Sequence, residues 1–215
     1  LGVVIGTLNG LVITRFNVAP FIATLGMMYV ARGFAMIRSG GATYSKITGN
    51  EALGNTGWEV FGRNIPGTVI PVGVVILAII AVIAAVILRK TAFGWHVLSI
   101  GGNEKAARLS GINDDRVLFI VYLNMSVLAA IAGIVFTARM NSCSTMIGNG
   151  FEGDAIAACF IGGASPATGS GTILGALIGA LVIGVLNNGM SIMGVQSDVQ
   201  MCVKGLVLMI AVVFD

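Results

Sequence analysis

The sequence has few charged residues and little proline. Charged residues make up 10% of its 215 residues and proline occurs 4 times, whereas soluble domains carry about 25% charged residues. With 56% hydrophobic residues and a mean hydropathy of +0.97, an ordinary soluble domain is excluded. The formal net charge is only +3 and there is no basic tract, so the composition gives no reason to propose a nucleic-acid partner.

Groups that bind metals or perform catalysis are also scarce. The chain has one histidine, His96, and its three cysteines lie far apart in or beside apolar segments: Cys143, Cys159 and Cys202. Their spacing matches no zinc or redox motif, so we expect free, buried thiols. The glycine-rich run Gly162–Gly171 contains no lysine and is therefore not a phosphate-binding loop. We expect no catalytic residue, no metal site and no cofactor.

The start of the chain has no signal-peptide features. Leu1 stands inside an apolar run, without the charged start and the small-residue cleavage site that a signal peptide needs. Leu1–Ile13 is typical of the tail of a membrane helix. We therefore expect residues 1–215 to be the C-terminal part of a longer membrane protein, whose first helices are not included.

Long apolar runs, by contrast, fill most of the sequence. A helix that crosses a bilayer needs about 20 mostly apolar residues. Asp154–Gly163 is apolar but too short for an ordinary crossing. The 31 glycines suit a bundle in which small residues let helix backbones approach closely. We predict an all-α, polytopic membrane bundle with spans at Pro20–Ile37, Val69–Leu88, Val117–Ala138, Thr172–Leu186 and Gln200–Phe214.

One polar segment, Gly101–Ile112 (GGNEKAARLSGI), interrupts these runs. Asn103 can cap a short helix, and Glu104 suits its first turn. Glu104 and Arg108 are spaced for a helical ion pair, and Gly111 stands where a left-handed C-cap would end the helix. We predict a helix of about two turns that a soluble partner grips. The alternative is an ordinary solvated helix in a loop.

The distribution of Lys and Arg predicts the orientation of the chain in the membrane. The connection 89–116 holds five of these residues and the slightly longer connection 38–68 holds three. Because cytoplasmic loops carry the excess of positive charge, we expect Gly101–Ile112 in the cytoplasm and the connection 38–68 outside.

A short internal repeat relates the two ends of the sequence. Residues 5–10 (IGTLNG) recur as residues 183–189 (IGVLNNG), and a glycine follows sixteen residues later in both copies, at Gly26 and Gly205. Paired repeats of transporters often run in opposite directions. Opposite directions require Asp154–Gly163 to cross as a short or broken helix, which leaves the C-terminus inside. If that segment is only re-entrant, the repeats are parallel and the C-terminus is outside.

Six segments in order give the chain a family resemblance. It resembles the membrane permease subunit of bacterial carbohydrate ABC importers of the ribose, xylose and galactose type. The segments that carry the resemblance are Asn9–Phe16 (NGLVITRF), Pro20–Gly26 (PFIATLG), Gly101–Ile112 (GGNEKAARLSGI), Asp154–Ser165 (DAIAACFIGGAS), Gly175–Gly194 (GALIGALVIGVLNNGMSIMG) and Val203–Asp215 (VKGLVLMIAVVFD).

The resemblance implies a fold and a set of partners. Residues 1–215 would form a transmembrane permease domain of the type-II importer kind in the bacterial inner membrane. A second permease copy, identical or a paralogue, would complete the path for a monosaccharide. A periplasmic sugar-binding protein would deliver the sugar, and a separate ATP-binding subunit would hydrolyse ATP, so the chain itself is no enzyme. The cytoplasmic coupling helix that docks on that subunit would be formed by Gly101, Gly102, Asn103, Glu104, Ala107, Arg108 and Gly111.

Four amides stand at or within membrane depth. An unpaired amide in lipid is expensive, so each should face other helices or the translocation path, where it can hydrogen-bond an uncharged sugar. A role as a helix cap or helix–helix contact remains the alternative, and Asn187 and Asn188 also precede Gly189, where a helix can end. The candidate path residues are Asn9, Asn124, Asn187 and Asn188.

Ionisable groups near the spans have simpler explanations. Lys204 lies near a span end and can reach the interface by snorkelling, and Glu152 and Asp154 precede a short helix whose N-terminus favours acids. The alternative function is a secondary carrier that works alone, or another membrane transport protein that is not an ABC transporter. Such carriers place ionisable groups near the midplane, and we expect none there.

Overall fold

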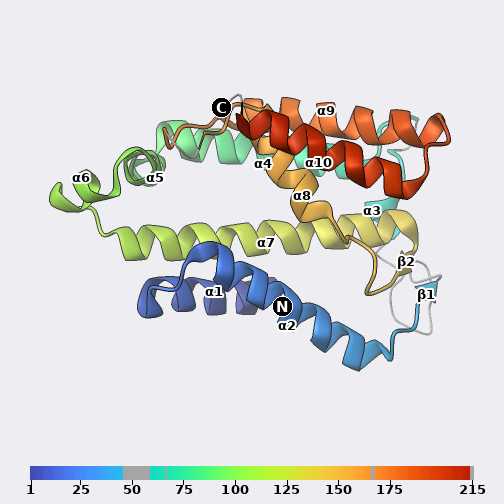
Figure 1. Cartoon of the computed structure of the whole chain (residues 1–215), viewed down its shortest axis with the longest axis horizontal. Coiled ribbons are helices and arrows are strands. Elements are labelled where there is room, and N and C mark those ends of the chain that lie inside the picture. The colour runs from blue at the N-terminus through green and yellow to red at the C-terminus, as the bar shows by residue number, and fades with distance from the viewer. Residues whose placement is uncertain (46–58, 66, 166–167, 214–215) are drawn as a thin grey trace. The chain divides into compact units, whose positions relative to one another are not determined.

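The computed structural model describes residues 1–45, 59–65, 67–165 and 168–213 (Figure 1). The described chain is helical apart from one two-stranded pair, β1 (Tyr44–Ser45) with β2 (Ser142–Cys143). Its helices are α1 (Gly2–Phe16), α2 (Pro20–Ser39), α3 (Glu59–Gly62), α4 (Val72–Lys90), α5 (Ala92–Gly102), α6 (Glu104–Leu109), α7 (Asp114–Met140), α8 (Phe151–Ile161), α9 (Ile173–Ile192) and α10 (Ser197–Val213). The predicted all-α class is confirmed.

Among the described residues, four helices are long and apolar enough to cross a membrane: α2, α4, α7 and α9. α10, which corresponds to the predicted span Gln200–Phe214, is not one of them, because its described part has 17 residues. α1 is a shorter apolar helix of 15 residues. α9 continues through Asn187 and Asn188 to Ile192, so the alternative in which these amides end the helix does not hold, and the helix extends beyond the predicted end at Leu186. The physical reason is that their neighbours Met190 and Ile192 extend the apolar run.

α5 is a helix that the sequence analysis treated as part of a connection. Its N-cap is Thr91, whose hydroxyl accepts a hydrogen bond from the Gly94 N–H at 3.3 Å. Its 11 residues are too few for a membrane span, which is why a search for long apolar runs missed it.

The chain forms two compact units. The first comprises Leu1–Ile80 with Asn113–Ile147, and the second comprises Ala81–Ile112 with Gly148–Asp215. α4 contributes its first half to the first unit and its second half to the second.

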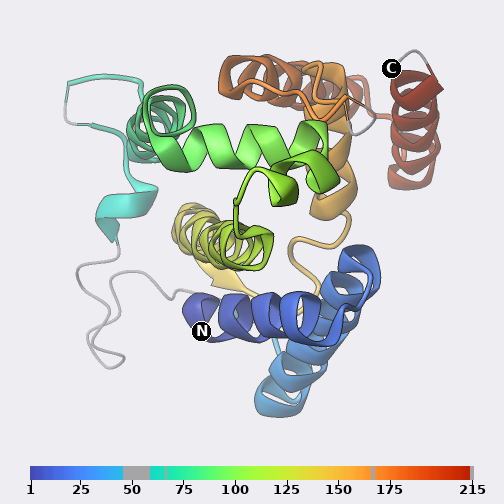
Figure 2. The ribbon, with the colours of Figure 1, turned by 90° about the vertical axis from the view of Figure 1, so that its left-hand side faces the viewer.

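In the first unit, glycines bring α1 close to α7. Figure 2 shows α1 (dark blue) next to α7 (yellow-green), which is seen nearly end-on. A Cβ added at Gly2 would lie 2.6 Å from the Cβ of Ala130, and a Cβ added at Gly6 would lie 3.0 Å from the Cβ of Ser126. At Gly10 an added Cβ would lie 2.6 Å from the Phe119 ring. The order of these contacts makes the two helices antiparallel, and the glycines allow a separation that side chains would prevent.

At one end of the first unit, the segment that follows α2 pairs with the segment that follows α7. α2 ends at Gly40 and α7 ends at Asn141, both with a left-handed backbone. The strands that follow then pair antiparallel, with Tyr44 opposite Cys143. Of the connection 38–68, residues 46–58 and 66 lie outside the described residues.

In the second unit, α8 and α9 form an antiparallel hairpin with α10 packed on it. Gly162 meets the backbone of Gly175, and Gly179 meets the backbone of Ala158. The small core formed by Ala157, Ala158 and Ile183 is completed by Ile161, Val207 and Leu208.

The short segment that the internal repeat depends on is a regular helix. α8 has 11 residues, or about 16 Å at the α-helical rise, which is about half of the hydrocarbon core. It runs antiparallel to α9. Whether the two repeats run in opposite directions depends on how α1 is oriented relative to α9. Because these helices belong to different units, the direction of the repeats stays a prediction.

Candidate functional site: a capped surface helix and polar groups at membrane depth

Local hydrogen bonds define both ends of α6. The Asn103 side chain accepts a hydrogen bond from the Ala106 N–H at 3.0 Å, as an N-cap does. At the other end the Gly111 N–H bonds the Arg108 carbonyl, and the Ile112 N–H bonds the Ala107 carbonyl. This pair of bonds is the Schellman motif, which needs the left-handed residue that Gly111 supplies with φ 85°. The predicted cap and helix end are confirmed.

The surface of α6 is open. Arg108 and Glu104 approach to 3.8 Å, as predicted, and their side chains are 65% and 61% exposed. Such an exposed pair adds little stability. Leu109 is 90% exposed, whereas Ala107 is buried. The exposed surface of α6 therefore carries the charges of Glu104 and Arg108 and the apolar side chain of Leu109, whereas Ala107 is on the buried face.

Gly101 and Gly102 do not belong to α6. They are the last two residues of α5, and Asn103 stands between the two helices. The Asn103 N–H donates to the Ser99 carbonyl at 3.0 Å. The same residue therefore ends α5 with its backbone and begins α6 with its side chain.

The four candidate amides occupy two kinds of environment. Asn9 is 5% exposed, on the face of α1 that also buries Gly6, Gly10 and Ile13. The Oδ1 atoms of Asn9 and Asn187 are buried and have no hydrogen-bond partner in the described part of the chain. These two residues hold matching positions in the internal repeat. Asn124 and Asn188 are exposed.

A charged cluster joins α8, α9 and α10 of the second unit. Lys204 Nζ of α10 lies 2.9 Å from Asp154 Oδ2 of α8. The amide of Asn187 on α9 donates to the same oxygen at 3.1 Å. The Asp154 and Lys204 side chains are 19% and 31% exposed. Asp154 lies in the first turn of α8, as expected, but it also neutralises a lysine.

Sequence reasoning missed this cluster because it explained each residue alone. Lys204 is the eighth residue of the 17-residue α10 and therefore lies near the middle of the helix. The prediction that its side chain snorkels from the end of a span is wrong. A usable signal was present: Asp154 and Lys204 both stand in apolar stretches, and ionisable groups inside a membrane usually pair with one another.

The three cysteines are free, as predicted, but all are exposed on this chain. The expected burial is wrong, because Cys159 and Cys202 lie on helix faces, and Cys143 on a strand, that no neighbouring described element covers. Among the described residues, no group of three or more His, Cys, Asp and Glu side chains can hold a metal ion.

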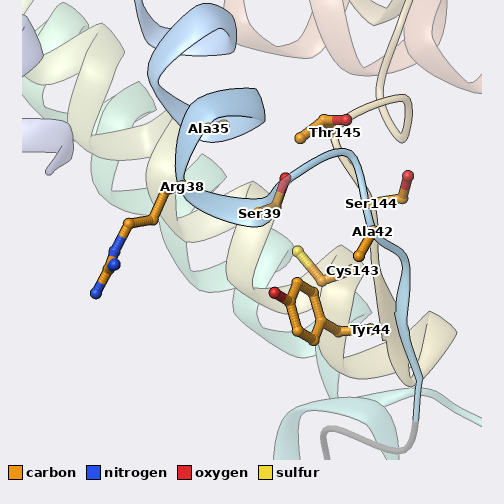
Figure 3. A pocket seen from close by; sticks show the side chains of 8 residues that line it. All are labelled: Ala35, Arg38, Ser39, Ala42, Tyr44, Cys143, Ser144 and Thr145. Carbon is orange, nitrogen blue, oxygen red and sulfur yellow. The ribbon is translucent and has the colours of Figure 1, made fainter.

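An open pocket of about 590 Å³ lies at the end of the first unit. Figure 3 shows the Tyr44 ring beside Cys143, while the Arg38 side chain extends away from them. α7 has 27 residues, so about 40 Å of helix separates this end from the start of α7. The pocket was not predicted, because it depends on the pairing of β1 with β2. Its lining is Ala35, Arg38, Ser39, Ala42, Tyr44, Cys143, Ser144 and Thr145.

Comparison with known proteins defines the class to which the chain belongs. The family model described as branched-chain amino acid transport system / permease component matches residues 1–212. The chain belongs to this family of membrane permease components. The family and the four apolar helices place it in the bacterial inner membrane as a multi-pass protein.

Individual relatives are import permeases for sugars. The chain is 46% identical to the ribose import permease protein RbsC of Bacillus subtilis (strain 168), over 96% of this chain and 62% of the relative. It is 42% identical to the ribose import permease protein RbsC of Escherichia coli (strain K12), over 100% of this chain and 66% of the relative. It is 36% identical to the galactose/methyl galactoside import permease protein MglC of Haemophilus influenzae, over 100% of this chain and 64% of the relative.

The chain thus spans a little under two thirds of the length of these curated relatives. No solved structure matches it. The resemblance found in the sequence is confirmed by the family model and by these relatives.

Proposed function

We propose that the chain belongs to the transmembrane subunit of an ATP-driven importer and helps to form the path of a monosaccharide across the inner membrane. The relatives named for ribose and galactose import support the substrate class. Because those relatives are longer, the proposal concerns the whole subunit to which residues 1–215 contribute.

The observation that carries the proposal is α6. It is a capped helix with an open surface. The short helix α5 connects it to α4, residues 110–113 connect it to α7, and both α4 and α7 are long enough for the bilayer. We infer that it docks on an ATP-binding cassette subunit in the cytoplasm. Glu104, Arg108 and Leu109 offer the contacts, while Asn103 and Gly111 fix the shape of the helix. ATP hydrolysis then belongs to that separate subunit.

Two further partners follow from the same proposal. A periplasmic sugar-binding protein delivers the sugar on the side opposite α6. A second permease copy, identical or a paralogue, encloses the path with this one. Exposed apolar side chains on the membrane-length helices, such as Phe34, Leu77 and Val185, support contacts with lipid or with other subunits.

The amides supply hydrogen bonds for an uncharged sugar. Asn124 and Asn188 are exposed on membrane-length helices. Amides facing lipid are costly, so we place these two on the path or on another subunit. Asn9 and Asn187 keep a buried Oδ1 without a described partner, and an acceptor of that kind can bind a hydroxyl group when the helices move apart.

Movement of α6 is the proposed source of transport. ATP binding and hydrolysis push and pull on Glu104–Ser110. This displacement tilts α4 and α7, the two membrane-length helices nearest in the chain, and the path opens to each side in turn.

The test is a co-purification with the full-length permease in membranes. A tagged wild-type permease should recover an ATP-binding subunit, and a permease with residues 103–110 scrambled should not, although it is expressed at the same level. Recovery of the ATP-binding subunit with both forms would overturn the docking role of α6.

A secondary carrier is the second candidate, and one observation favours it. The Asp154–Lys204 pair places ionisable groups inside an apolar bundle, where ion-coupled carriers keep theirs. The two functions separate in proteoliposomes. Uptake that follows an ion gradient in the absence of any ATP-binding subunit would establish the carrier, and uptake that requires the subunit and ATP would establish the importer.

A further inference from the structure

Two glycines from distant parts of the second unit meet backbone to backbone. Gly101 is in the last turn of α5, and Gly169 is in the loop before α9. A Cβ added at Gly101 would lie 2.9 Å from the Gly169 carbonyl oxygen, and a Cβ added at Gly169 would overlap the Gly101 carbonyl group. Since real Cβ atoms do not approach so closely, any side chain at either position has to separate the two segments.

The Gly101 side of this contact is joined to α6. The Asn103 backbone N–H caps α5, and the Asn103 side chain caps α6. Only Gly102 lies between Gly101 and this shared cap. A displacement of α6 therefore reaches Gly101 through two residues of hydrogen-bonded backbone.

Hydrogen bonds also link the loop that contains Gly169 to the start of α9. The Ser165 N–H donates to the Ser170 carbonyl at 2.9 Å, and the Thr168 and Ser170 hydroxyls lie 2.7 Å apart. Two residues after Ser170, the Thr172 hydroxyl caps α9 by accepting from the Gly175 N–H at 3.0 Å. The described part of this loop is thus fastened directly to the start of α9.

α9 in turn holds α8 and α10. Gly175 and Gly179 lie against the backbone of α8, and Asn187 shares Asp154 with Lys204 of α10. Packed helices move as bodies rather than by gradual deformation. A push at the start of α9 is therefore expected to move the amides Asn187 and Asn188 near its other end.

We propose that the Gly101–Gly169 contact passes the movement of α6 to α9, which makes these two glycines positioning residues for the coupling of ATP hydrolysis to transport. The proposal rests on the proposed function, in which α6 docks on the ATP-binding subunit. It adds a route from α6 to α8, α9 and α10, beside the proposed route through α4 and α7. Two backbones in direct contact transmit a small displacement that a flexible side chain would absorb.

The experiment uses the complete importer in proteoliposomes and measures sugar transported per ATP hydrolysed, with radiolabelled ribose, xylose and galactose as probes. The main variant is Gly101→Ala, which adds a Cβ against Gly169 without a positive φ. Its control is Gly102→Ala, the next residue of the same helix, whose Cβ would meet nothing within 4 Å. Gly169→Ala is paired with Gly163→Ala, which has a similar positive φ of 76° but open space around its Cβ.

We expect Gly101→Ala and Gly169→Ala to lower the transported sugar per ATP by about fivefold relative to their controls, a typical size for a change in coupling. ATP-binding subunit should co-purify undiminished with all four variants. The double variant Gly101→Ala/Gly169→Ala should be no worse than the poorer single variant, because both act at one contact.

A second measurement covers the case in which Gly169→Ala fails to fold. Hydrogen exchange of the wild-type complex should change at residues 168–176 when a non-hydrolysable ATP analogue binds. The same change should be lost in Gly101→Ala.

Two results would overturn the proposal: equal coupling in Gly101→Ala and Gly102→Ala, or exchange at residues 168–176 that does not respond to the nucleotide in the wild type. Either result leaves the docking role of α6 standing if the scrambled 103–110 segment still loses the ATP-binding subunit. The two proposals therefore fail separately.

Discussion

Lys204 and Asp154, 50 positions apart in the chain, form an ion pair of 2.9 Å between α10 and α8. Asn187 of α9 donates to the same carboxylate oxygen. α10 packs on the small core of Ala157, Ala158 and Ile183 through Val207 and Leu208. The ion pair adds a polar contact between α8 and α10 to this apolar one.

Removing one partner of this pair should destabilise the protein more than removing both. Lys204→Met leaves the Asp154 carboxylate without its cation, and we expect a loss of about 2 kcal/mol, reduced from the value for a fully buried pair because both groups are partly exposed. Folded yield and resistance to denaturant in detergent measure this loss.

The double variant Asp154→Asn/Lys204→Met should recover much of the stability lost in Lys204→Met. Glu152→Gln is the matched control, because Glu152 lies in the same first turn of α8 but is exposed. A double variant as unstable as the sum of the single ones would contradict a direct interaction.

Loss of the α6 cap should weaken docking. Asn103→Ala removes the hydrogen bond to the Ala106 N–H, and a lost N-cap costs about 1 kcal/mol, or about fivefold in an equilibrium constant. We expect the affinity for the ATP-binding subunit to fall by about this factor, as measured with the purified subunit. Asn103→Asp keeps a capping oxygen and should restore the affinity.

Asn113→Ala serves as the control for this prediction. Asn113 caps α7 with the same geometry, accepting from the Arg116 N–H at 3.1 Å, but it lies outside α6. Equal loss of affinity for the ATP-binding subunit in Asn103→Ala and Asn113→Ala would contradict the prediction. The loss would then reflect general helix stability and not the cap of α6.

Because α8 and α9 pack closely, any side chain at position 179 should destabilise the protein. Gly179→Ala directs a Cβ into the carbonyl group of Ala158, so we expect a loss of about 1–3 kcal/mol from overpacking. Gly184→Ala on the same helix adds a Cβ in open space and should change stability little. Thermal unfolding in detergent compares the two, and equal effects would argue against the packing of this hairpin.

The exposed apolar side chain of α6 should serve binding and not folding. Leu109 is 90% exposed, so Leu109→Glu should leave the thermal unfolding of the permease unchanged while it lowers recovery of the ATP-binding subunit. A fall in permease stability, with recovery intact, would assign Leu109 to a packing role instead.

The sequence predicts best what depends on neighbours within a few residues. The caps of α6, its ion pair and the positive φ of Gly111 all follow from local spacing, and long apolar runs locate α4 and α7 to within a few residues. α5 was missed because its apolar run is short. The Asp154, Asn187 and Lys204 cluster was missed because its members are 33 and 50 residues apart, and only packing brings them together.

Sugar uptake after charge reversal on α6 tests the coupling role most directly. In proteoliposomes with the ATP-binding subunit and the sugar-binding protein, Glu104→Arg and Arg108→Glu should each abolish most ATP-dependent uptake of labelled sugar. Both substitutions reverse charges that we propose contact the ATP-binding subunit. Asp198→Lys, which reverses an exposed charge at the start of α10, should leave uptake near the wild-type level. Unchanged uptake in both α6 variants, at equal expression, would contradict the proposal that this helix couples ATP hydrolysis to import.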